Sequence, residues 1–303
     1  MLDNVKFSFI KHCKIFWIVS ACIMCVGLLM NVIFGVEMDV AFKGGTLLKY
    51  SYTGELDTAA AETFFTEQIG EKATVETSVD GGVTLINVYS TAVVDNEKQQ
   101  TINDSFAKSF EANTPELTAA NAIQPSLGNL FFVKCLVALL LASLLLVFYV
   151  AYRFRKIGGW SAGLMAVVAL VHDLLIVYFT FVIFRIPLDG NFVAVMLTIL
   201  GYSLNDTIVI YDRIRENRSR LGKSADICEV VDLSLRQSFR RTMNTSVTTT
   251  IVVLTLVVVA LTQNLDAIIS FAVPLFFGVL SGFYSSTFLC APAWALWTKK
   301  RNK

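Results

Sequence analysis

The chain has 303 residues, of which 55% are apolar and only 16% are charged. Soluble globular proteins are about 45–50% apolar and about 25% charged, so this composition suits a lipid bilayer better than water. The formal net charge of +1 gives no reason to expect a nucleic-acid partner.

Six segments are long and apolar enough to cross a membrane, since a spanning helix needs roughly 20 mostly apolar residues. They are residues 15–36, 130–152, 160–184, 191–211, 242–261 and 267–297. The first exceeds the apolar core of a signal peptide, about 7–15 residues, and no Ala-X-Ala-like site follows it, so we expect an uncleaved anchor. The last contains Pro274, where we expect a kink or a tilt.

The placement of Lys and Arg predicts the orientation of these spans. Three precede the first span, three lie between the second and third, eight lie between the fourth and fifth, and four follow the sixth, which together are 18 of the chain's 25. Because basic residues favour the cytoplasmic side, we expect both chain ends in the cytoplasm, with the protein in an inner-type membrane.

The one long loop, residues 37–128, is predicted to fold outside the cytoplasm. It holds 14 Asp and Glu but 5 Lys and Arg, and its pattern alternates between strands and helices. Strands are predicted at 46–52, 73–79, 83–89 and near 122–125, and helices at 56–69 and 96–110. Asp80-Gly81-Gly82 is a tight hairpin signal between the middle strands. The order β-α-β-β-α-β predicts a small ferredoxin-like α+β domain.

The predicted fold is therefore a membrane all-α bundle of six transmembrane helices with one extracytoplasmic α+β domain. Its parts are residues 1–36 with the first span, residues 37–128 as the outer domain, and residues 129–303 with the other five spans and a cytoplasmic loop between the fourth and fifth. That outer domain has no cysteine, so no disulfide framework is expected. Cys22 and Cys25 lie in an apolar run and are predicted to pack there.

Asp206 is the first candidate functional residue, because an ionisable group at the centre of a spanning helix costs about 2.5–3.5 kcal/mol on insertion scales. It follows Asn205 in the fourth span and shares a helical face with Tyr202. Asn205 and Asp206 either hold helices together through hydrogen bonds or form a protonatable site on an ion path. The second interpretation is favoured.

The fifth span opens with a polar stripe that includes Arg241. Either it anchors the helix at the membrane edge, with hydroxyl groups bonded to backbone carbonyls, or Arg241 pairs with Asp206. A nearby arginine favours an ionised carboxylate while burial opposes it, so such a site could change its protonation as helices shift.

His172 and Asp173 lie near the middle of the third span. A proton relay and a hydrogen bond between helices are both consistent with this pair. No enzyme is expected, because the sequence offers no candidate hydrolytic triad and no Walker A motif, and no cofactor or metal is predicted. The Gly44-Gly45 pair predicts a close approach of two backbones where the first span enters the outer domain.

These motifs resemble the SecD/SecF family of the bacterial Sec protein-export machinery, and within it the SecF subunit. The resemblance is carried by Gly201-Tyr202-Ser203-Leu204-Asn205-Asp206-Thr207-Ile208-Val209, Asp212-Arg213-Ile214-Arg215-Glu216-Asn217, Arg241-Thr242, Thr245-Ser246, Gly44-Gly45-Thr46 and Pro125-Ser126 with Gly128. One departure is Ala41, which stands before Phe42 where the family usually has an acid, so the role of that acid is not carried over to Asp39.

The resemblance implies a SecD-like partner of the RND superfamily, the SecYEG channel, a YajC-like subunit, and a translocating preprotein as the moving substrate. It implies that proton flow through the spans drives motion of the outer domain. The family's transmembrane Asp corresponds to Asp206 and its span-five Arg to Arg241, with Arg240 as the second choice. Asn205 and Asp173 complete the predicted proton-coupling set.

Two other functions are weighed. An RND-type exporter of small molecules, acting as a half-unit, would share the intramembrane Asp, but such exporters usually have twelve spans in one chain. A purely structural scaffold for the channel would not need the acid at all. The sequence leaves open whether sodium replaces the proton.

Overall fold

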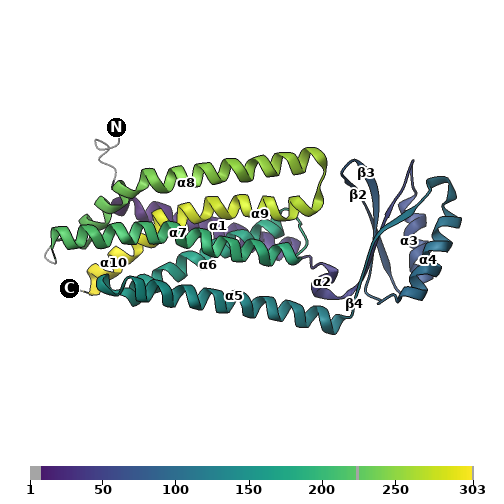
Figure 1. Ribbon diagram of the computed structural model, residues 1–303, viewed down its shortest axis with the longest axis horizontal. Helices are drawn as coiled ribbons and strands as arrows, with labels where there is room; N and C mark the ends of the chain where they lie inside the picture. The colour runs from purple at the N-terminus through teal and green to yellow at the C-terminus, as the bar shows by residue number, and fades with distance from the viewer. Residues whose placement is uncertain (1–7, 223–224, 302–303) are drawn as a thin grey trace.

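The computed structural model describes residues 8–222 and 225–301. In this part of the chain, six helical segments long and apolar enough to span a membrane lie together as a bundle (Figure 1), which confirms the predicted spans. They are α1 (Phe9–Phe34), α5 (Pro125–Arg153), α6 (Gly159–Ile183), α7 (Gly190–Leu221), α8 (Ile227–Gln263) and a sixth made of α9 (Asp266–Tyr284), η3 (Ser285–Cys290) and α10 (Ala291–Arg301).

Short polar side chains set where the helices begin. Ser8 accepts the backbone N–H of Lys11 before α1, Asp189 accepts those of the second and third residues of α7, and Asp226 accepts that of Cys228 before α8. These N–H groups have no partner within their own helix, and satisfying one typically stabilises a helix by about 1 kcal/mol.

The segment between the fourth and fifth spans, which the sequence predicts to be cytoplasmic, is almost wholly helical. α7 continues to Leu221 and α8 already begins at Ile227. Ion pairs between neighbouring turns, such as Glu216 with Arg213 and Arg220, support the polar extensions. Hydropathy marks where a helix leaves lipid but does not mark where it ends, so the polar turns could not be found from apolar content.

The sixth span does not break at Pro274, which lies inside α9. The helix instead changes to a π-helical stretch, η3, before α10 begins. Such stretches inside α-helices are frequent at functional sites.

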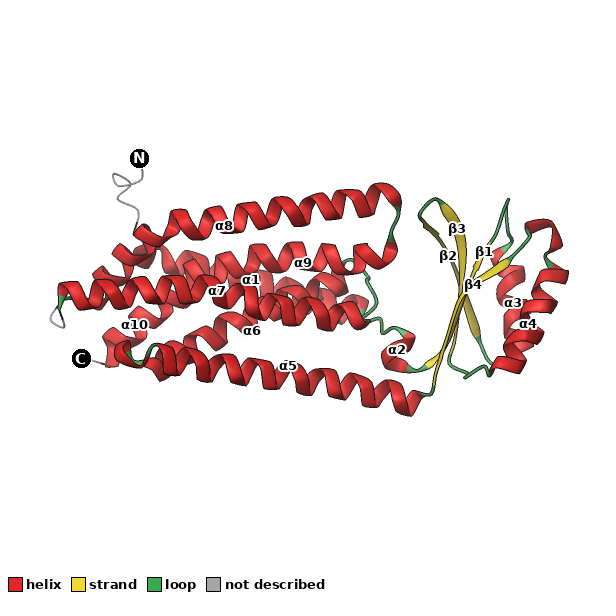
Figure 2. Cartoon of the chain, viewed as in Figure 1, coloured by secondary structure: helices red, strands yellow, loops and turns green. Residues whose placement is uncertain are grey.

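Between α1 and α5 the chain forms the short α2 (Val40–Lys43) and a small α+β unit. The unit contains β1 (Gly45–Ser51), α3 (Thr58–Ile69), β2 (Ala73–Asp80), β3 (Val83–Ser90), α4 (Asn96–Ser109) and β4 (Glu116–Ile123). Its antiparallel sheet has the order β2-β3-β1-β4, and both helices cover the face turned away from the bundle (Figure 2). This confirms the predicted β-α-β-β-α-β order.

The core of this unit lies between the sheet and the two helices. Tyr50 of β1 packs against Phe65 of α3 and Phe106 of α4, with ring centroids 5.7 and 4.9 Å away, and the three residues are buried. The sequence predicted only a short extended stretch near 122–125, whereas β4 starts at Glu116. Its run of Ala and Asn has weak strand preference, so only pairing with β1 establishes it as a strand.

The α+β unit is joined to the bundle at two places. The N–H of Leu188 donates to the carbonyl of Glu37, and the N–H of Asp39 donates to the carbonyl of Leu188, which ties the end of α1 to the α6–α7 turn. Phe42 of α2 packs on two neighbouring phenylalanines of α5, with ring centroids 5.5 and 5.2 Å from its own.

Gly44 and Gly45 lie at this entry, and both have the backbone conformation that favours glycine, with φ of 78° and 115°. A Cβ on Gly44 would lie 2.4 Å from the Cα of Pro125, and one on Gly45 would lie 2.3 Å from the carbonyl oxygen of Ser90. The predicted close approach of backbones is therefore confirmed.

Replacing Gly45 with Ala is expected to destabilise the α+β unit by roughly 2–4 kcal/mol, because it adds a clash with a strand backbone to the cost of a left-handed φ. Gly54→Ala is the matched control, since its φ is 79° but its nearest neighbour would be 3.7 Å away. Limited proteolysis of the purified protein should cleave Gly45→Ala faster than Gly54→Ala. Equal cleavage rates would contradict the steric explanation.

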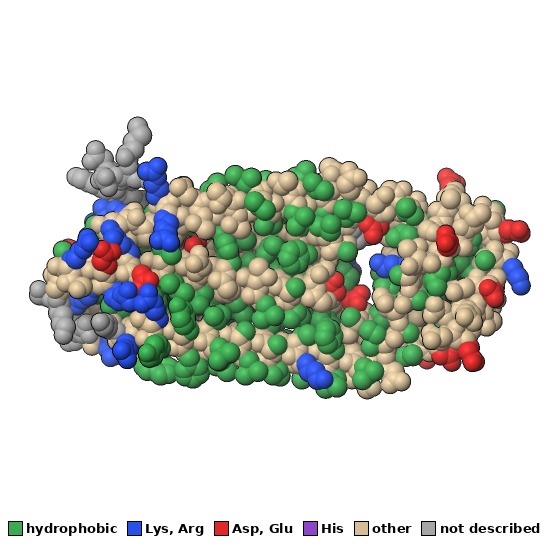
Figure 3. All heavy atoms as spheres, in the orientation of Figure 1, with side chains coloured by type: hydrophobic (Ala, Val, Ile, Leu, Met, Phe, Trp, Pro, Cys, Tyr) green, Lys and Arg blue, Asp and Glu red, His purple; other side chains and the backbone are tan. Residues whose placement is uncertain are grey.

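Lys and Arg side chains gather at the end of the bundle that lies away from the α+β unit (Figure 3). We call it the basic end, and its described residues are Lys11, Lys14, Arg153, Arg155, Arg213, Arg215, Arg218, Arg220, Arg236, Lys299, Lys300 and Arg301. Lys6, Lys223 and Lys303, which also belong to the sequence pattern, lie outside the described residues. The N-terminal end of α1 and the C-terminal end of α10 both lie here (Figure 1).

Candidate functional site

Asp206 lies inside the bundle between α7 and α8, and it is only 2% exposed. Its Oδ2 accepts a hydrogen bond from the hydroxyl of Ser246 on α8, at 3.4 Å. Tyr202, one turn earlier on α7, donates to the same hydroxyl oxygen at 3.3 Å. The carboxyl is therefore shielded from solvent and held by neutral polar groups.

Two of the residues predicted to act with Asp206, Arg241 and Asn205, lie on outer faces of the helices. Arg241 is exposed, and within the described part of the chain no ion pair joins it to Asp206. Five residues of helix, about 7.5 Å, separate Arg241 from Ser246. Asn205 is exposed on the uncovered face of α7, although it adjoins Asp206 in the sequence. The pairing of Asp206 with Arg241 or Arg240 stays a prediction.

Asp173 of α6 is fully buried and accepts hydrogen bonds from three serines. Oδ1 accepts from Ser281 at 2.6 Å, and Oδ2 accepts from Ser203 and Ser285, both at 2.6 Å. The Nδ1 of His172 lies 3.1 Å from Oδ1. The Nε2 of His172 is buried and has no hydrogen-bond partner in the described structure.

These serines were not predicted from the sequence. Ser281 and Ser285 are four residues apart, so they lie on one face of the last span, and Ser285 begins the π-helical stretch. A polar pair at helical spacing within an apolar span was the signal that could have found them. Nothing in the sequence pairs them with an acid more than 100 residues away.

The two carboxyl groups are connected through α7, where Ser203 and Asp206 lie three residues apart on the same side. Thr207 shares a hydrogen bond of 2.9 Å with Ser286, whose hydroxyl lies 3.1 Å from the carbonyl oxygen of Ser203 and donates to it. We call the resulting group the polar band; its members are His172, Asp173, Ser203, Asp206, Thr207, Ser246, Ser281, Ser285 and Ser286.

The polar band crosses four helices of an otherwise apolar bundle. A carboxyl can gain or lose a proton, and hydroxyl groups both donate and accept hydrogen bonds, so each carboxyl of the band has chemistry that can hold a proton. The described residues contain no group of three or more His, Cys, Asp and Glu suited to a metal ion.

Comparison with known proteins gives relatives along the whole chain. Residues 102–300 match the family model described as "Protein export membrane protein SecD/SecF, C-terminal". A protein translocase subunit SecF of Rhodothermus marinus is 31% identical over 298 residues, which are 96% of this chain and 93% of that protein. The SecF of Thermobaculum terrenum is 30% identical and covers 99% of this chain and 95% of its own length.

Longer relatives match this chain over only part of their own length. The SecDF of Bacillus subtilis is 30% identical over 98% of this chain, but the chain spans only 39% of that protein. The crystal structure of SecDF from Thermus thermophilus, described as a translocon-associated membrane protein, superposes with a TM-score of 0.81 over 98% of this chain and 39% of its own. At 24% identity, that likeness shows the fold alone.

Proposed function

Because this chain belongs to the SecD/SecF family of protein export membrane proteins, we propose that it uses proton flow to promote export of preproteins through the SecYEG channel. Its relatives are named as translocase subunits, which agrees with the prediction of an accessory protein rather than an enzyme. The proposed setting is a bacterial inner membrane, with the basic end in the cytoplasm and the α+β unit outside.

The observation that carries the proposal is the burial of Asp206 inside the membrane bundle, where its carboxyl accepts a hydrogen bond from the hydroxyl of Ser246. An ionised carboxylate in such a place is costly, and the protonated form removes most of that cost. A change of protonation at Asp206 therefore changes which packing of α7 and α8 has the lower free energy.

The energy for this cycle comes from the membrane potential, which supplies about 2.3 kcal/mol per charge per 100 mV. On α8, Arg241 lies more than one turn before Ser246, the residue that donates to the carboxyl of Asp206. A shift of α8 relative to α7 would bring the charges of Arg241 and Asp206 together. We propose that this approach belongs to the deprotonated state, with Asp173 and His172 as the continuation of the proton path. The α+β unit would transmit the motion outward to the preprotein.

A SecD-like subunit is the proposed partner in the membrane, with SecYEG and a YajC-like subunit as further members of the assembly. Support comes from the uncovered face of α7, where Gly201 and Asn205 lie one turn apart and both are exposed. An amide in lipid is unfavourable, and a small residue allows close approach of another helix. This stripe is typical of a helix–helix interface rather than of a lipid-facing surface.

Replacing Gly201 with Leu is expected to reduce co-purification of the SecD-like subunit from mild detergent at least fivefold. Apart from the neighbouring backbone of its own helix, a Cβ at Gly201 meets no atom of the described residues within 4 Å, so the substitution should leave the fold undisturbed and obstruct only a partner. Ala138→Leu, on the exposed side of α5, is the matched control and should co-purify normally. Full recovery of the partner with Gly201→Leu would contradict this interface.

The exporter alternative has less support. The SecF relatives match over nearly their full length, and they are named as translocase subunits. Preprotein export into membrane vesicles under an imposed proton gradient tests the proposed function, because the export rate is expected to depend on the carboxyl of Asp206.

A further inference from the structure

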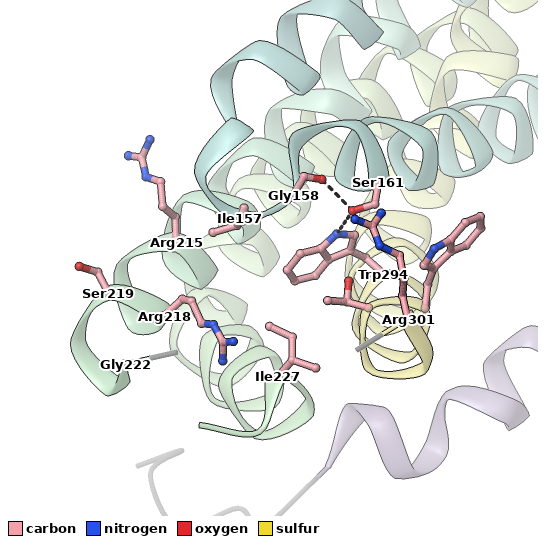
Figure 4. Close-up of a pocket in the computed structure, with 12 residues that line it drawn as sticks. Ile157, Gly158, Ser161, Arg215, Arg218, Ser219, Gly222, Ile227, Trp294 and Arg301 are labelled. Carbon is pink, nitrogen blue, oxygen red and sulfur yellow. Dashed lines mark hydrogen bonds between the residues drawn. The ribbon is translucent and has the colours of Figure 1, made fainter. Parts of the chain in front are cut away.

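A cavity of about 570 Å³ opens at the basic end, where α6 and α8 begin and α7 and α10 end (Figure 4). Its described lining includes three arginines, two tryptophans and three hydroxyl side chains, but no Asp or Glu. A cavity with this lining has an excess of positive charge and of hydrogen-bond donors, and it is unconnected with the polar band.

Two of the arginines place their guanidinium groups on the walls of the cavity. Arg218 lies on one wall beside Ile227, where its Nη1 donates to the carbonyl of Ala225 at 2.6 Å, so its guanidinium is held in place (Figure 4). Arg301 lies on the opposite wall beside Ser161 and Trp294, and it makes no hydrogen bond in the described part of the chain. Arg215 points away from both and pairs with Asp212 at 2.9 Å.

The first turn of α6 forms another part of the wall. Gly158 precedes it with φ of 103° and offers no side chain to cap the helix, so the N-terminal N–H groups keep their partial positive charge. The hydroxyl of Ser161 donates to the carbonyl of Gly158 at 2.7 Å and accepts from Trp294 Nε1 at 3.1 Å, which fixes this wall. The hydroxyl oxygen of Thr298 is buried without a hydrogen-bond partner in the described structure.

We propose that this cavity binds the phosphate of an anionic phospholipid head group. Guanidinium groups bind phosphate oxygens strongly, and an uncapped helix N-terminus favours the same anion. The cavity lies where the spans end, and tryptophans favour that depth of the membrane. Basic pockets between spanning helices on the cytoplasmic side are suited to anionic head groups, and the absence of a carboxylate from the described lining disfavours a zwitterionic one.

The test measures lipid binding to the full-length protein in mild detergent. Native mass spectrometry with added phosphatidylglycerol is expected to show one tightly retained lipid per chain. The double variant Arg218→Gln with Arg301→Gln should weaken this binding at least tenfold. Arg220→Gln with Lys300→Gln is the matched control, because it removes two positive charges at the same helix ends but outside the cavity, and it should bind like the unmodified protein.

Three results would overturn the proposal. Equal loss in both double variants would show general attraction to a basic surface. Equal retention of phosphatidylcholine would show that no anion is selected. Protection against thermal unfolding by inorganic phosphate but not by phosphatidylglycerol would show a site for a soluble anion. Arg301→Gln alone, which removes no hydrogen bond in the described chain, keeps the test valid should Arg218→Gln disturb the α7–α8 turn.

Discussion

Replacing Asp206 with Asn is expected to reduce export driven by a proton gradient to the level of membranes that lack this protein. The amide fills almost the same volume and can still accept a hydrogen bond from Ser246, but it cannot gain or lose a proton at neutral pH. Because the proposed coupling passes through this carboxyl, the loss should be near complete. The measurement is the initial rate of preprotein export into inverted membrane vesicles under an imposed gradient.

Asp212→Asn is the matched control on the same helix. Asp212 is half-buried at the basic end, where it pairs with Arg153 at 3.1 Å and Arg215 at 2.9 Å. Surface ion pairs of this kind contribute about 0–1 kcal/mol, so export should remain close to normal. Both variants should insert and retain the SecD-like partner. Normal export by Asp206→Asn at an unchanged protein level would remove the basis of proton coupling at this residue.

The parts of the fold that follow from local pattern could be predicted from the sequence. A span of about 20 apolar residues has few alternatives in a bilayer, and hairpin glycines such as Gly81 and Gly82 fix the turn between two strands. The glycines at 44 and 45 could be interpreted because each demands a backbone that other residues avoid. In each of these cases the physical constraint acts within one segment.

The helical extensions of α7 and α8 could not be found in the same way. Their residues are charged, and their support includes contacts between helices, such as the amide of Asn217, which donates to Ser234 at 2.8 Å. Asp232 of α8 likewise accepts the backbone N–H of Phe9 at 2.7 Å. Hydrogen bonds between polar residues far apart in the sequence do not affect the spacing of apolar residues, so the apolar pattern could not predict these helical turns.

The candidate site likewise contains residues that could be predicted from the sequence and residues that could not. The position of Asp206 in a span predicted that its carboxyl faces the bundle interior, because a carboxyl facing lipid is costly, and the structure buries it there; its functional role stays a prediction. Its neighbour Asn205 was grouped with it, yet successive residues of a helix point about 100° apart, so the structure places one inside and the other outside. The serine partners of Asp173 come from α7, α9 and η3, and only the tertiary fold brings them together.

Replacing Asp173 with Ala is expected to destabilise the bundle by about 3–5 kcal/mol. The substitution removes the acceptor of three serine hydroxyls and the neighbour of His172, and each buried polar group left unpaired costs about 1–3 kcal/mol. For a chain of this size the unfolding temperature of the purified protein should fall by roughly 10 °C. Differential scanning fluorimetry in mild detergent measures the change.

Two further variants separate structure from proton transfer at the same place. Ser281→Ala removes one donor and leaves two other serines on the carboxyl, so it should lower the unfolding temperature by less than half as much. Asp173→Asn keeps an acceptor oxygen, and serine hydroxyls can rotate to accept from its amide, so most stability should return. Export lost in a stable Asp173→Asn protein would place this carboxyl on the proton path, because packing alone could not explain the loss. Normal export by that variant would restrict Asp173 to holding α6, α7 and α9 together and leave Asp206 as the site of coupling.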